Sequence, residues 1–151
     1  MAKTNTIPFP QNIQSPAVTI VNATGFTATN PGTAPTNTVL FATAGADGSI
    51  MKSIVISSDD TSSRVIELWI STDSGTTKYR LSSVTVPASS GSAGTVNVDF
   101  FAGTVFVGTC YDETGKPVLP LTANARLYCA VTTAAVTASK TVYITGVQFD
   151  Y

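Results

Sequence analysis

The side chains that usually carry out acid–base or nucleophilic chemistry are scarce in this chain, and those present are scattered. The 151 residues include no His, two Cys, eight Lys or Arg and nine Asp or Glu, whereas Ser and Thr number 40. Catalysis near neutral pH relies on His or on tuned carboxylates and lysines, and a hydroxyl nucleophile needs an adjacent base. The composition therefore favours a protein that is not an enzyme.

Six of the nine acidic residues occur singly or in pairs in segments rich in Gly, Ser or Thr. They are Asp47, Asp59, Asp60, Asp73, Asp112 and Glu113. None of these segments has the D-x-[DN]-x-[DN]-G spacing of a calcium loop. Because Asp and Ser stabilise turns by bonding to nearby backbone, we expect turns here and no metal site. An ion shared at a subunit junction is the alternative.

Two further acidic residues invite comparison with a glycosidase pair. Glu67 and Asp99 are separated in sequence, and no motif connects them. The chain also contains no GxSxG, P-loop or GxGxxG motif. We expect no catalytic residues and no cofactor.

Cys110 and Cys129 lie in apolar, strand-like segments, and there is no CxxC motif and no His to complete a zinc site. We expect two buried free thiols, with a cross-strand disulfide as the alternative. The formal net charge of −1 and the isoelectric point near 5.1 predict no nucleic-acid partner, which normally requires a basic face. The sequence shows no apolar run of membrane-spanning length and no secretory signal, so we expect synthesis in a host cytoplasm and no membrane partner.

Short runs rich in Val, Ile, Thr and aromatic residues alternate with turn-forming segments, and this pattern predicts β-strands. Eight strands are expected, at 17–21, 38–43, 50–58, 64–72, 78–86, 104–111, 126–133 and 140–149. Residues 94–102 fit either a strand or one or two helical turns. The spacing predicts an all-β fold, an antiparallel β-sandwich or jelly roll, formed by one domain at residues 17–151.

Side chains alternate between the faces of a strand, so sequence parity predicts which residues face the core. Ile66, Leu68 and Ile70 are expected in the core, whereas Glu67 and Trp69 share the opposite face. Trp69 therefore either packs under a loop or contacts another subunit.

Parity also makes predictions for two other strands. Ile50, Ile54 and Ile56 agree in parity with Lys52 and are expected on one face. In the last strand, Gly146 is a candidate β-bulge that changes the parity.

Residues 1–16 are expected to form an extended N-terminal arm. Pro8, Pro10 and Pro16 favour extended backbone around them. Three apolar residues, Ile7, Phe9 and Ile13, are the candidate anchors for a partner. A frayed terminus is the alternative.

Parts of the chain resemble small β proteins of tailed bacteriophages. The resemblance lies in residues 40–50, 52–56, 64–70, 79–81, 84–88, 115–128 and 131–151. These segments are similar to head decoration, or cement, proteins, which sit on the capsid exterior. The resemblance implies a jelly-roll-like sandwich, a homotrimer, binding to the major capsid protein and a place on the virion surface.

The resemblance implies no catalytic residues, and Ile7, Phe9, Ile13 and Trp69 are the residues expected at interfaces. A fibre or tail module that recognises a host glycan is the second hypothesis, because jelly rolls serve both capsids and lectins. An enzyme that depends on Asp or Glu is the third hypothesis.

Overall fold

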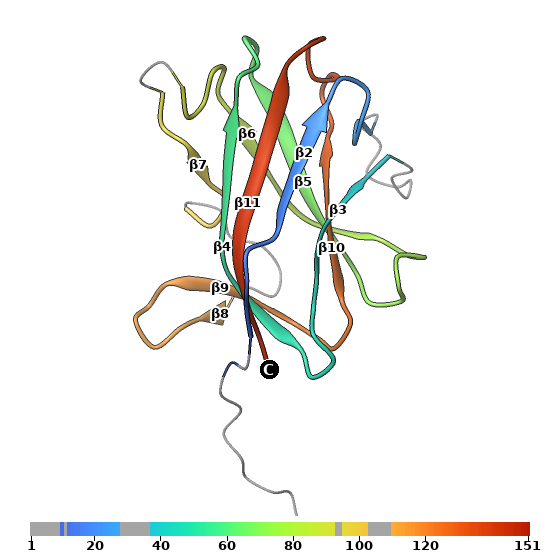
Figure 1. Ribbon diagram of the computed structural model, residues 1–151, viewed down its shortest axis with the longest axis vertical. Helices are drawn as coiled ribbons and strands as arrows, with labels where there is room; N and C mark the ends of the chain where they lie inside the picture. The colour runs from blue at the N-terminus through green and yellow to red at the C-terminus, as the bar shows by residue number, and fades with distance from the viewer. Residues whose placement is uncertain (1–9, 11, 28–36, 93–94, 103–109) are drawn as a thin grey trace, which may run out of the picture.

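The computed structural model describes residue 10 and residues 12–27, 37–92, 95–102 and 110–151. Two antiparallel sheets pack face to face in this part of the chain (Figure 1), which confirms the predicted all-β sandwich. The strands are β1 (Asn12–Gln14), β2 (Ala17–Val21), β3 (Val39–Thr43), β4 (Ser49–Ser58), β5 (Arg64–Ser71), β6 (Tyr79–Val86), β7 (Val98–Asp99), β8 (Cys110–Tyr111), β9 (Pro117–Leu121), β10 (Arg126–Val131) and β11 (Thr141–Asp150).

The chain crosses repeatedly between the two sheets. The smaller sheet has the order β3-β10-β5-β6. In the larger sheet β11 pairs with β1 and β2 on one side and with β4 on the other, and β4 also pairs with β7 and β9, followed by β8. The framework β2-β11-β4-β7 facing β3-β10-β5-β6 has the jelly-roll-like order expected from the sequence. The described strands number eleven, because three short ones add to the predicted eight.

The core lies between the sheets, where alternate residues of each strand meet. In β11, Val142 and Ile144 are buried, while Tyr143 between them and Thr145 after them are exposed. In β5, Ile66 and Leu68 are fully buried in the same core, and Ile70 packs against it. Sequence parity predicted the β5 positions correctly, because this strand keeps a regular period of two at these residues.

The faces of β4 differ from the prediction because the strand contains a bulge. Val147 of β11 pairs with Ser53, and the next residue, Gln148, pairs with Met51, so Lys52 is the extra residue. Ile54 and Ile56 face the core, but Met51 takes the inner position before the bulge. Ile50 therefore lies on the outer face.

Gly146 has a different role from the predicted bulge. The buried positions of β11 keep the same parity from Val142 to Asp150 on both sides of Gly146. A Cβ atom at Gly146 would lie 2.8 Å from the Ser53 carbonyl oxygen and 2.9 Å from Cζ of Phe41. The position requires glycine because the Phe41 ring packs directly on the backbone there.

Three short strands were missing from the predicted set. They are β1, inside the expected arm, β7, inside the ambiguous segment 94–102, and β9. Strand β9 begins at Pro117 and contains Pro120, and prolines argue against a central strand when only the sequence is known. Of the predicted strand 104–111, only Cys110 and Tyr111 are described, as β8.

Candidate functional site

An apolar row crosses four strands on the outer face of the larger sheet. Ile13 in β1 pairs with Phe149 in β11, Phe149 pairs with Ile50 in β4, and Ile50 pairs with Pro120 in β9. Directly paired residues place their side chains on the same face, about 5 Å apart. Ile13 is 66% exposed, Pro120 is exposed, and Phe149 and Ile50 are half-buried. These four residues are called the outer row below.

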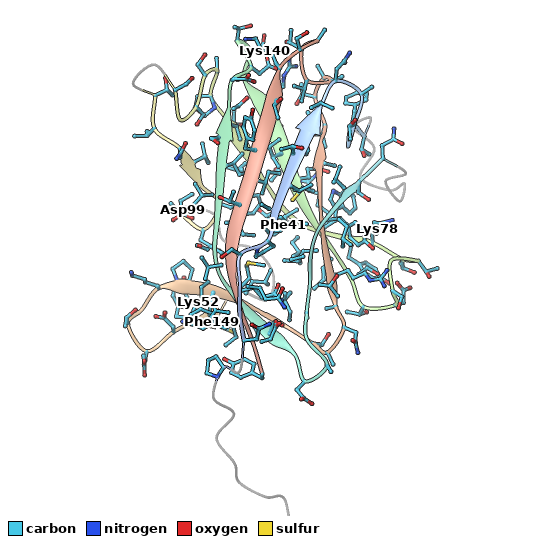
Figure 2. The ribbon with its side chains drawn as sticks, viewed as in Figure 1. Phe41, Lys52, Lys78, Asp99, Lys140 and Phe149 are labelled. Carbon is cyan, nitrogen blue, oxygen red and sulfur yellow. The ribbon has the colours of Figure 1, made fainter. Side chains whose placement is uncertain are left out.

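One cation lies against the outer row. The ammonium of Lys52, the bulge residue, lies 5.9 Å from the centre of the Phe149 ring and 3.0 Å from Oδ2 of Asp112. Figure 2 shows Lys52 and Phe149 together near the end of the sandwich where β8 and β9 lie in Figure 1. A cation over an aromatic face is attracted by the ring electrons. The row therefore combines exposed apolar surface with one positive charge that Asp112 holds in place.

Of the three candidate anchors in the N-terminal arm, Ile13 is the one that the structure describes. It lies in β1, and its side chain belongs to the outer row. Ile7 and Phe9 lie outside the described residues. Ile7, Phe9 and Ile13 all have odd numbers, so an extended segment would project them on the same face.

Trp69 is buried by its own chain. It is 4% exposed and forms a small cluster with Tyr128 and Ala130 on the outer face of the smaller sheet. Tyr128 pairs with Trp69 across the strands, and the Lys78 ammonium lies 4.9 Å from the centre of the Tyr128 ring. Of the two alternatives for Trp69, intrachain packing is the one that this geometry favours.

The two carboxylates considered as a glycosidase pair lie in different sheets. Glu67 in β5 is buried, and its Oε1 forms an ion pair with Arg80 Nη1 at 2.9 Å. Asp99 in β7 belongs to the larger sheet, is exposed and accepts a hydrogen bond from the Phe101 amide. Glu67 thus has a structural partner, and the fold does not pair it with Asp99.

A buried ion pair joins Asp60 and Arg64. Arg64 Nε donates to Asp60 Oδ2 at 2.7 Å, and the backbone amide and hydroxyl of Thr137 also donate to Asp60. Burial alone raises the pKa of Asp60, but the hydrogen bonds from Arg64, Thr137 and Ser62 together hold it well below its usual range. This network connects the β4–β5 turn to the segment before β11.

Asp73 and Asp112 stabilise turns, as predicted. Asp73 accepts hydrogen bonds from the Thr77 amide and the Ser71 hydroxyl. Asp112 accepts them from the Thr114 amide and hydroxyl and from the Lys116 amide. Within the described residues, no group of three His, Cys, Asp or Glu side chains is placed to hold a metal ion.

The two cysteines have different environments. Cys129 lies in the core and Cys110 is exposed, and both thiols are free. The prediction was therefore correct for Cys129 and wrong for the burial of Cys110. Cys110 is in the short strand β8 at the end of the larger sheet, so little of the fold covers it.

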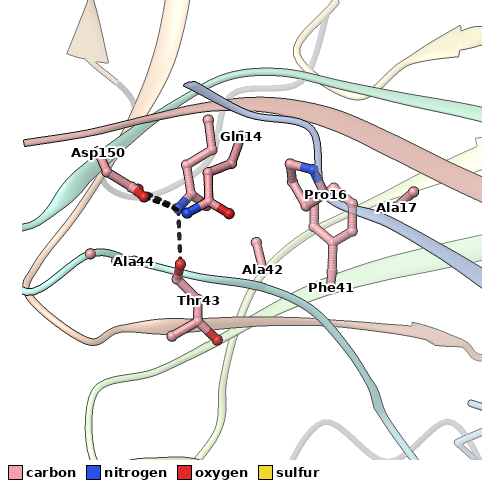
Figure 3. Close-up of a pocket in the computed structure, with 10 residues that line it drawn as sticks. Gln14, Pro16, Ala17, Phe41, Ala42, Thr43, Ala44 and Asp150 are labelled. Carbon is pink, nitrogen blue, oxygen red and sulfur yellow. Dashed lines mark hydrogen bonds between the residues drawn. The ribbon is translucent and has the colours of Figure 1, made fainter. Parts of the chain in front are cut away.

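A cavity of about 520 Å³ opens where the β1–β2 edge of the larger sheet faces β3. Its size lies within the range of small-molecule sites. Gln14 and Asp150 stand at one end, and Phe41, Pro16 and Ala17 at the other (Figure 3). The cavity thus has a polar end and an apolar end.

Hydrogen bonds concentrate on Asp150 at the polar end. Its carboxylate accepts from Gln14 Nε2 at 2.7 Å, from Ser49 Oγ at 2.5 Å and from Gln148 Nε2 at 2.6 Å. Burial raises the pKa of Asp150, but these hydrogen bonds outweigh burial and lower it. Asp150 is therefore charged at neutral pH although it is only 8% exposed.

This polar group was not predicted, although the sequence carries a signal for it. Gln148 and Asp150 have the same parity as the core residues Val142 and Ile144, so β11 places two polar side chains at inward positions. Buried polar groups need partners. Polar residues at the core positions of a strand therefore indicate such a cluster.

No protein-family model, curated protein or solved structure matches this chain. The part of the chain that the structure describes contains no helix long and apolar enough to cross a membrane.

Proposed function

We propose that the protein is a virion structural protein that binds the outside of a phage capsid as an oligomer and stabilises the shell. The observation that carries the proposal is the outer row, which presents Ile13, Phe149, Ile50 and Pro120 as a continuous strip across four strands. An exposed apolar strip with a polar surround is typical of a protein–protein contact.

The N-terminal segment extends this strip. Ile13 joins the row, and Ile7 and Phe9 share its parity, so an extended arm adds apolar side chains on the same face. Pro8 and Pro10 reduce the freedom that the segment loses when it docks. Added as a strand to a sheet of the major capsid protein, the arm would combine backbone hydrogen bonds with two apolar anchors.

A free strand edge supports oligomerisation. Strand β6 ends the smaller sheet, and among the described residues it pairs only with β5. An unpaired edge of eight residues is a template for pairing with another chain, and closed oligomers cover such edges. A homotrimer that brings several arms to one capsid position would bind through many weak contacts acting together.

Glycan recognition receives less support. It requires grouped exposed aromatic side chains, whereas the exposed tyrosines Tyr79, Tyr111 and Tyr143 lie in β6, β8 and β11, which belong to different sheets or to distant strands of one sheet. The outer row therefore favours a protein partner over a sugar.

The decisive experiment combines capsid binding with the mass of the free protein. Purified protein is mixed with phage capsids that lack it, the particles are sedimented, and light scattering gives the oligomeric state. We expect saturable binding by a trimer. Ile13→Asp should reduce occupancy at least tenfold, because it places a charge in the outer row.

Val96→Asp provides the matched control. Val96 is 82% exposed, but it lies in the loop before β7, away from the outer row and from the free edge of β6. We expect this variant to bind capsids as the wild type does. Equal capsid occupancy for the wild type and Ile13→Asp would show that the outer row does not contact the capsid. A monomeric protein that does not bind capsids would overturn the proposed function.

A further inference from the structure

Asp150 is a buried negative charge that has no cationic partner among the residues that the structure describes. The ion pairs of the described residues join Lys52 to Asp112, Arg64 to Asp60 and Arg80 to Glu67. The groups that donate to Asp150 are the neutral side chains of Gln14, Ser49 and Gln148, together with the neutral backbone amide of Gly45. A buried charge is unfavourable unless it is paired. The other buried acidic side chains, those of Asp60 and Glu67, do have a basic partner.

A second acceptor belongs to Gln148, which also lines the cavity. Gln148 is 1% exposed, and its Nε2 donates to Asp150, Ser49 and the Thr43 carbonyl oxygen. Its Oε1 is buried and has no hydrogen-bond partner within the described residues. The amide cannot be reversed without loss, because Oε1 would then face the oxygens of Asp150 and Thr43. The polar end therefore needs hydrogen-bond donors.

The opposite end of the cavity suits a hydrocarbon stem. Phe41 and Pro16 form its wall and Ala17 lies beside them, as Figure 3 shows. The Phe41 ring is fixed because it packs on Gly146. A ligand that fits both ends has an apolar stem of several carbons and a head group that carries positive charge and donates hydrogen bonds.

We propose that this cavity binds an organic cation on an alkyl stem, of the lysine or arginine side-chain type. The stem packs against Phe41 and Pro16, and the ammonium or guanidinium group pairs with Asp150. Both head groups carry several donors and no acceptor, so they complement a carboxylate and an unpartnered amide oxygen. The site does not depend on the capsid role, because the cation can belong to any protein partner or to a free amine.

The test is a titration followed by two-dimensional NMR of the backbone and side-chain amides. The probes are Nα-acetyl-lysine methylamide, its arginine equivalent and n-butylammonium, and the neutral control is Nα-acetyl-norleucine methylamide. At low ionic strength we expect saturable shifts of the Gln14 and Gln148 side-chain amides, with Kd on the order of 1–10 mM for a single charge-assisted contact. The norleucine control should bind at least tenfold more weakly.

The probes also distinguish the two sources of the cation. A site for a protein side chain accepts the blocked lysine or arginine as well as it accepts n-butylammonium. A site for a free amine binds n-butylammonium and excludes the blocked amino acids, because their backbone does not fit. Either result supports the cation site.

Two variants and one control locate the contact. Asp150→Asn removes the charge, and Pro16→Phe narrows the apolar end from a half-buried position that has the inward parity of Val18 and Ile20. Each should weaken binding at least tenfold, and Pro16→Phe keeps the test valid if Asp150→Asn does not fold. Glu113→Gln removes one exposed charge outside the cavity and should leave Kd unchanged. Equal shifts with lysine and norleucine probes, or binding unaffected by both variants, would overturn the proposal.

Discussion

Arg64 donates from Nε to Asp60 Oδ2 at 2.7 Å, and both side chains are almost completely buried. Thr137, which lies far along the chain, donates to the same carboxylate and accepts from Arg64 Nη2. The pair is therefore the centre of a network that joins two loops at one end of the sandwich. Removal of either charge leaves the other buried without a partner.

Asp60→Asn should lower the free energy of unfolding by about 3–5 kcal/mol, the usual cost of breaking a buried ion pair from one side. Urea denaturation measures the change. Asp47→Asn is the control, because Asp47 is exposed and should change stability by less than about 0.5 kcal/mol. Similar midpoints for the two variants would show that the Asp60 network contributes little.

Stability should be constant between pH 5 and 8 and should fall in acid. The chain has no His, so no side chain with an ordinary pKa in that interval titrates. Below it, hydrogen bonds from Thr77 and Ser71 lower the pKa of Asp73 to about 2, and the pKa values of Asp60, Asp112 and Asp150 are also lowered.

The sign of the acid effect follows from these shifts. Each carboxylate has a lower pKa in the folded state than the value of about 3.9 of an unfolded Asp, so below about pH 4–5 the unfolded state binds more protons. The free energy of unfolding therefore decreases as the pH falls toward 2. Urea titrations at several pH values measure this free energy. A shallower decrease with pH in Asp60→Asn than in the wild type would give the contribution of Asp60 to the acid effect. A loss of stability between pH 8 and 6 would contradict the prediction.

Gly146→Ala should destabilise the protein by about 1–3 kcal/mol, the range observed for overpacked cores. The added methyl group meets the Ser53 carbonyl oxygen and the Phe41 ring closer than normal contact distance. Thermal and urea unfolding measure the loss. Phe41→Leu introduced together with Gly146→Ala should recover part of the stability, since it removes the contact with the Phe41 ring. No recovery would place the strain on the other two contacts, with the Ser53 carbonyl oxygen and with Met51 Sδ at 3.2 Å.

One thiol should react in the native protein and two after denaturation. Cys110 is exposed, whereas Cys129 lies in the core and burial raises the pKa of its thiol. Quantitative labelling with a chromogenic disulfide reagent at pH 8 measures the number. Cys110→Ser should abolish the native reaction and leave one thiol in urea. Rapid reaction of Cys129 in the folded protein would show that the core opens easily.

The sequence was most informative where apolar runs are bounded by strong turn formers. Strand β2 was predicted with the observed ends, and Ile66 and Leu68 were placed in the core correctly. Prediction failed where the geometry depends on a partner strand. The bulge at Lys52 arises from pairing with β11, and β9 is a strand in spite of Pro117 and Pro120 because it adds to the side of β4.

The candidate sites were predictable to different degrees. Ile13 was selected from its apolar character near prolines, but its neighbours in the outer row come from three other strands, and pairing partners cannot be read from one sequence. The residues around Asp150 were missed because Gln14, Ser49 and Asp150 are far apart in the chain. Parity shows that Asp150 points inward, but the predicted strand ended at residue 149, before Asp150.

The bulge at Lys52 also makes the charge of the outer surface independent of its apolar strip. Without residue 52, β4 would pair with β11 continuously, and Ile50 would still face outward and Met51 inward. Lys52 is therefore equivalent to a one-residue insertion that brings a cation to the Phe149 ring and leaves the faces of its neighbours unchanged. The charge of this surface can be gained or lost by a single codon, while its apolar strip stays the same.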